Sequence, residues 1–196
     1  MFVITADQRG SRSQPDRVDA ALRLVGAAPL VRPFERTAGD ELQGVADDPA
    51  AALGVVLLLV RDGHWSVGVG VGGVRTPLPE QTRAGAGEAF ERARVAVTRA
   101  KARPDHVALD AAGADAEDAD ALLSVHAAIV ARRSAAGWEA VDMVESGLTQ
   151  SEVAERLGIS KQAVSQRLRA AWWPQQAGTT PLLVRLLRAL DDGELP

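Results

Sequence analysis

The sequence predicts an α+β fold. A ferredoxin-like domain of βαββαβ order with an added αβ unit occupies residues 1–112, and an all-α domain with a helix-turn-helix at 149–172 occupies 113–196. Strand-like and helix-like segments alternate in the first part, residues 111–120 are only Ala, Gly, Asp and Glu, and every later periodic segment has helical spacing. We expect an antiparallel sheet covered by helices on one face.

The first domain opens with a short apolar strand that ends before Asp7. Asp47-Asp48-Pro49 begins a helix, because Asp accepts hydrogen bonds at a helix start and Pro needs no partner for an N–H there. Alternation of apolar and small residues predicts a strand at 64–72. The expected elements are strands at 2–6, 30–36, 42–46, 64–72 and 107–109, and helices at 15–27, 49–60 and 85–102.

The second domain contains helical patterns throughout. Trp138 fits the core of one helix, and Trp172-Trp173 fits a core or an interface. The last helix has a wide apolar face that either closes this domain or forms a dimer contact. The expected helices are 121–135, 137–146, 149–157, 161–172 and 180–190.

Composition excludes several classes of protein. The 196 residues are 46% apolar and 24% charged, which is a globular balance. No apolar run reaches the roughly 18–20 residues of a spanning helix, and the first residues do not resemble a signal peptide. There is no cysteine, and the net charge of −4 requires any nucleic-acid surface to be local. We expect a soluble cytoplasmic protein without a membrane segment.

Residues 149–172 resemble a helix-turn-helix. Ala154 is small where two helices would cross, Gly158 permits the sharp turn, and Ser160 can cap the second helix. Thr149 and Glu152 have capping-box spacing. The alternative is a plain helical hairpin with a solvated basic face.

The second helix of this motif would enter the major groove of double-stranded DNA. Four basic and no acidic residues lie between Arg156 and Arg169. Because such proteins usually read paired half-sites, we expect a homodimer. The candidates for base contacts are Lys161, Gln162, Ser165 and Gln166, and those for phosphate contacts are Arg156, Arg167 and Arg169.

A second candidate site lies in the first domain. Asp7 ends the first strand and Asp40 sits at the hairpin tip, and these places are neighbours in a βαββ unit. Two carboxylates there can hold Mg²⁺ or Mn²⁺, while Arg9, Ser11 and Arg12 can bind phosphates. The alternative is turn chemistry, since Asp is common in tight turns. The glycines at 68, 70, 72 and 73 permit either a ligand's approach or tight packing under a helix.

This layout resembles the core of class III nucleotidyl cyclases and of GGDEF-type diguanylate cyclases. The segment 38–42, Ala-Gly-Asp-Glu-Leu, is close to the GGDEF signature, and in the helix at 85–102 Arg94 matches a transition-state Arg while Phe90 stands at an Asn position. The start of the chain, the hairpin, the glycine-rich strand and the C-terminal helix-turn-helix together resemble the SatD family and its actinobacterial relatives. The resemblance implies a nucleotide-related N-terminal domain on a DNA-binding protein.

Two functions follow from these motifs. The first is a sequence-specific transcription regulator whose N-terminal domain senses a nucleotide or metal–nucleotide, or dimerises. The second is a metal-dependent nucleotidyl-transfer enzyme in which Asp7 and Asp40 hold the metal, Arg94 stabilises phosphate charge and the helix-turn-helix is accessory. Because Phe90 stands where the cyclases have an Asn, we rank the enzyme hypothesis below the regulator hypothesis.

Overall fold

The computed structural model describes residues 1–193 and has the mixed α/β composition that the sequence predicts. One five-stranded sheet has the order β2-β3-β1-β4-β5. The strands are β1 (Phe2–Gln8), β2 (Arg32–Arg36), β3 (Glu41–Ala46), β4 (Trp65–Val71) and β5 (Val107–Asp110). The helices are α1 (Val18–Val25), α2 (Pro49–Asp62), the 3₁₀ turn η1 (Thr82–Ala84), α3 (Glu88–Lys101), α4 (Ala116–Arg132), α5 (Ala135–Glu145), α6 (Gln150–Leu157), α7 (Lys161–Ala170) and α8 (Trp173–Asp192).

The sheet is mixed rather than wholly antiparallel. The central strand β1 runs antiparallel to both β3 and β4, whereas β4 and β5 run parallel. The parallel pair follows from the connection between them, because α3 crosses over and returns the chain in the same direction.

Helices cover both faces of the sheet, so the expectation of a single covered face is wrong. Phe2 and Ile4 of β1 point into a core shared with α2, α4 and α8, whereas Val3 points to the other side and packs with Phe90 of α3. Side chains alternate along a strand, so a central strand that is buried along its length must be covered on both sides.

Two glycines of β4 serve this packing. A Cβ atom on Gly68 would lie 2.1 Å from the backbone nitrogen of Val97, and one on Gly70 would lie 2.1 Å from the carbonyl oxygen of Ala89. Both neighbours are backbone atoms of α3. Of the two interpretations of these two glycines, tight packing of the strand under a helix is the one observed.

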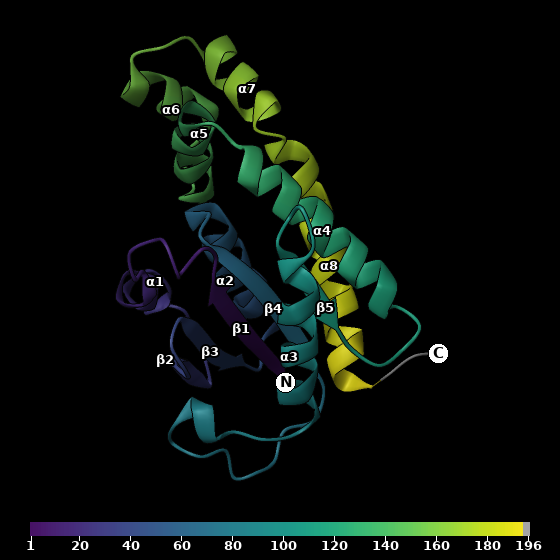
Figure 1. Cartoon of the computed structure of the whole chain (residues 1–196). Coiled ribbons are helices and arrows are strands. Elements are labelled where there is room, and N and C mark those ends of the chain that lie inside the picture. Colours follow the sequence, from purple (N-terminus) through teal and green to yellow (C-terminus); the bar gives the residue numbers. More distant parts are fainter. Residues whose placement is uncertain (194–196) are drawn as a thin grey trace.

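Two long helices link the sheet to the rest of the chain. In Figure 1, α4 and α8 lie side by side and run from the sheet to the end of the molecule that carries α6 and α7. Leu123 of α4 and Leu187 of α8 belong to the same core as Phe2. Both helices begin earlier than predicted, at Ala116 and Trp173, and the acidic residues after 114 form the first turn of α4. The domain boundary at 112/113 stays a prediction.

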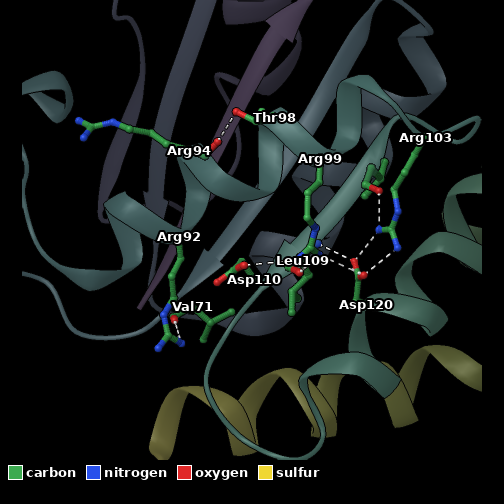
Figure 2. Close-up of polar contacts among 10 residues, drawn as sticks. Val71, Arg92, Arg94, Thr98, Arg99, Arg103, Leu109, Asp110 and Asp120 are labelled. Atoms are coloured by element: carbon green, nitrogen blue, oxygen red, sulfur yellow. Dashed lines mark hydrogen bonds and ion pairs between the residues drawn. The ribbon is translucent and has the colours of Figure 1, made fainter.

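A carboxylate network fastens α4 to the sheet. Asp120 accepts hydrogen bonds from Arg99, Arg103 and the backbone N–H of Leu109, as Figure 2 shows. Asp120 is therefore the point where the C-terminal helices join α3 and β5.

Within residues 1–193, no helix is long and apolar enough to cross a membrane.

Candidate functional site

The segment α5–α7 has a small core of its own. Val141 of α5, Val153 and Ala154 of α6, and Val164 and Leu168 of α7 are buried together. Ala154 lies at the contact of α6 and α7, the position where the sequence requires a small residue. Three helices thus form a separate layer at one end of the molecule (Figure 1).

The turn between α6 and α7 has the predicted geometry. The Thr149 side chain and the Glu152 backbone and side chain form a complete capping box. Gly158 has φ +64°, a left-handed conformation that favours glycine. Ser160 caps α7 and accepts a hydrogen bond from the N–H of Ala163 at 3.1 Å. These contacts fix the crossing of α6 and α7.

The residues predicted to contact bases lie on the outer side of α7. Lys161, Gln162 and Gln166 are exposed and Ser165 is half-buried. Residues three and four positions apart share one face of a helix. The face that contains 162, 165, 166 and 169 is therefore opposite the buried residues at 164 and 168.

The basic residues around α7 are of two kinds. Arg156 and Arg169 are exposed. Arg167 instead forms an ion pair with Glu139 of α5, with Nη1 and Oε2 2.7 Å apart. Arg167 is therefore half-buried against α5, and its Nη1 already has a carboxylate partner.

Comparison with known families agrees with this geometry. Residues 127–172 match the family described as Sigma-70, region 4, from the second half of α4 to the residue before α8. The chain contains a helix-turn-helix domain of a DNA-binding type. No curated protein and no solved structure matches the chain. The match supports the helix-turn-helix and gives no support to the SatD or cyclase-like resemblance.

The first-domain candidates gather in one polar depression. Asp7, Arg9, Ser11, Arg12 and Asp40 all line it. The sheet brings them together, because Glu41 is the register partner of Asp7, and the carbonyl of Asp40 accepts a hydrogen bond from the N–H of Gln8 at 3.1 Å. The end of β1 and the hairpin tip are thus adjacent, as expected for a βαββ unit.

Lys101 and His106 also line this depression, and neither was predicted. Lys101, the last residue of α3, forms an ion pair with Asp7 at 2.7 Å. His106 lines the same depression, and burial together with Arg9 lowers the pKa of its imidazole. Lys101 ends α3 and His106 directly precedes β5, so both lie nearly a hundred residues after Asp7. No local pattern in the sequence points to either of them.

The ion pair affects the metal prediction. One carboxylate of the expected pair, Asp7, already has a cationic partner. Within residues 1–193, no group of three His, Cys, Asp or Glu side chains is close enough together to hold a metal ion. A divalent ion here would take its remaining oxygen ligands from water or from a bound phosphate.

Arg94 lies on an exposed part of α3. Its backbone carbonyl accepts a hydrogen bond from the Thr98 hydroxyl at 2.8 Å, and its side chain extends away from the Asp120 network (Figure 2). The depression that holds Asp7 and Asp40 adjoins Lys101, at the far end of the same helix. Arg94 therefore lies about two helical turns from Lys101, the residue of α3 that lines the depression.

Proposed function

We propose that this protein is a sequence-specific, DNA-binding transcription regulator. The observation that carries the proposal is the exposed stripe of α7, in which Gln162, Ser165 and Gln166 share one face beside Lys161. The family match over residues 127–172 supports the same function.

The first turn of α7 has the properties of a recognition helix. Helix-turn-helix proteins place the start of the second helix against base edges in the major groove. The amide of Gln162 or Gln166 can form two hydrogen bonds with adenine, and Lys161 can bind guanine. The exposed Arg156 and Arg169 can contact the phosphates that fix the position of the helix. A homodimer would read two half-sites about one turn of DNA apart.

The experiment is selection of preferred duplexes from a random pool, followed by affinity measurement on the selected and a scrambled duplex. For Gln162→Ala/Gln166→Ala we expect loss of the preference, while weak binding to both duplexes remains. Gln175→Ala is the matched control, because Gln175 is exposed on α8, outside the stripe. An unchanged preference in the double variant would exclude α7 as the recognition helix.

We further propose that the first domain is ferredoxin-like and senses a phosphate-bearing ligand, such as a nucleotide with Mg²⁺ or Mn²⁺. The order β2-β3-β1-β4, with β1 antiparallel to both neighbours, supports the ferredoxin-like arrangement. Arg9, Arg12, Lys101 and Ser11 supply donors for phosphate oxygens. The alternative function, metal-dependent nucleotidyl transfer, would require Arg94 to reach this ligand.

Incubation with ATP, GTP, CTP and UTP, with Mg²⁺ or Mn²⁺, distinguishes the two functions. Calorimetry measures binding and mass spectrometry detects products. We expect binding without turnover, and weaker binding by Arg12→Ala. Turnover that is lost in both Asp7→Asn and Asp40→Asn would establish the enzyme instead.

A further inference from the structure

An apolar pocket of about 540 Å³ lies where the helices of the sheet meet those of the helix-turn-helix. Its walls come from α1 and α2 on one side and from α4, α5 and α8 on the other. Leu53, Leu57, Val130 and Val184 supply much of the apolar wall. Sites for small molecules generally have volumes of roughly 300–1,000 Å³ and a few well-placed polar groups.

The main polar group of this pocket is Arg133. Its side chain is only 8% exposed. The Nε atom donates to the carbonyl of Ala171, and Nη2 donates to the side-chain oxygen of Gln176. Within residues 1–193, no carboxylate oxygen comes within 4.0 Å of this guanidinium, and Nη1 has no hydrogen-bond partner. A buried cation that has only neutral partners is destabilising.

The neighbouring carboxylates have other partners. The carboxylate of Asp142 accepts hydrogen bonds from both terminal nitrogens of Arg61, each 2.7 Å long. Glu145 accepts a hydrogen bond from the indole of Trp173 at 3.3 Å. Both act on Arg133 through space, but burial is the larger effect and lowers the pKa of its guanidinium.

The ring of Trp138 holds the two arginines in place. The guanidinium carbons of Arg61 and Arg133 lie 3.9 Å and 4.2 Å from its centroid. Cation–π contacts of this kind orient a guanidinium without neutralising it. The polar end of the pocket therefore holds two oriented guanidinium groups beside an apolar wall, and the carboxylate of Glu145 lines it as well.

We propose that this pocket binds a small amphipathic monocarboxylate, with its carboxylate on Arg133 and its apolar body against α2 and α8. Charge complementarity selects the head group, because a carboxylate supplies the direct ion-pair partner that Arg133 lacks within residues 1–193. The apolar walls select the body. The inference goes beyond DNA binding and is tested without DNA.

Gly54 provides a way to fill the pocket. It lines the wall in the middle of α2, and a Cβ atom built on it meets nothing within 4 Å. Gly54→Leu would place side-chain atoms in the pocket and reduce its free volume, and both Leu and Ala favour a helix more than Gly does. Gly54→Ala is therefore the matched control for any effect on the helix.

The experiment is calorimetric titration of the full chain with decanoate and, as the uncharged control, with decanol. We expect decanoate to bind at least about tenfold more tightly than decanol, a difference of about 1.4 kcal/mol. Gly54→Leu should abolish binding and Gly54→Ala should retain it. Arg133→Met, checked for folding by circular dichroism, should remove the preference for decanoate.

Three results would overturn the inference: no binding of decanoate, equal affinity for decanoate and decanol, or unchanged binding by Gly54→Leu. If Arg133→Met does not fold, the pair of Gly54 variants and the decanol control still decide the question. Because none of these measurements contains DNA, their failure is separate from a failure of the recognition helix.

Discussion

Both terminal guanidinium nitrogens of Arg103 donate hydrogen bonds to the carboxylate of Asp120, and each bond is 2.8 Å long. Arg103 follows α3, whereas Asp120 belongs to α4, so this pair connects the sheet to the helices that carry the helix-turn-helix. The side chain of Asp120 is 13% exposed and also accepts the N–H of Leu109 at 2.7 Å. The hydrogen bond with Asp120 raises the pKa of Arg103.

We predict that Asp120→Asn lowers the free energy of unfolding by about 1–3 kcal/mol, because the half-buried guanidinium of Arg103 loses its counter-charge, whereas the exposed Arg99 keeps Asp110 as a partner. Urea denaturation measures the change. Asp118→Asn, at an exposed position of the same helix, should change stability by less than about 0.5 kcal/mol. Equal stability of the two variants would contradict the role assigned to Asp120.

Gly68→Ala is expected to destabilise the protein by about 1–3 kcal/mol, because its Cβ would overlap the backbone of α3 at Val97. Thermal unfolding checks this expectation. Gly73→Ala provides the control, since a Cβ there meets nothing within 4 Å. A neutral Gly68→Ala would show that α3 does not lie as close to β4 as the structure places it.

The ion pair of Asp7 with Lys101 leads to a prediction about metal binding. Lys101→Met should strengthen Mn²⁺ binding by about tenfold, because the Asp7 carboxylate then lacks a competing cation. Asp7→Asn should weaken the same binding. Paramagnetic relaxation of water protons by Mn²⁺ provides the measurement. If both variants bind like the parent protein, Asp7 is a turn residue and not a metal ligand.

The two kinds of arginine near α7 should differ in DNA binding. Arg169 is exposed and can contact a phosphate. Arg169→Ala should therefore reduce the slope of log binding constant against log salt concentration by about one. Arg167 is paired with Glu139, so Arg167→Ala should have a smaller effect on that slope. Affinities at several salt concentrations test this order, and a larger effect of Arg167→Ala would reverse it.

His126 makes stability dependent on pH. The imidazole is fully buried between α4 and α8, its Nε2 lies 2.9 Å from the Thr179 hydroxyl, and burial lowers its pKa. The unfolded chain therefore binds the proton more readily. The contribution of the neutral His126 to the free energy of unfolding is complete above the ordinary histidine pKa of about 6.5. This contribution is lost as the pH falls below that value.

Urea midpoints at pH 7.5 and 5.5 measure this loss. His126→Gln should make the two midpoints more similar, whereas His64→Gln should preserve the difference between them. An unchanged difference in His126→Gln would assign the pH dependence to other groups.

The helix-turn-helix is the part that local sequence specified most completely. Its capping box, its turn glycine and its buried apolar residues act over a few positions, so Thr149, Gly158 and Val164 could be interpreted without a fold. The strands were predictable for the same reason, because alternation reflects burial of the strand itself. The convergence of Asp7 and Asp40 followed from the order of strands.

The sequence alone determined the mixed fold class, the approximate positions of the strands and helices, and the helix-turn-helix. Only the tertiary structure decided that helices cover both faces of the sheet, that Lys101 pairs with Asp7 and that Arg133 faces an apolar pocket. Local propensity reports on contacts within a few residues, whereas these contacts join segments far apart in the chain. Their partners are chosen by packing and charge in the folded protein, and short-range periodicity contains no record of that choice.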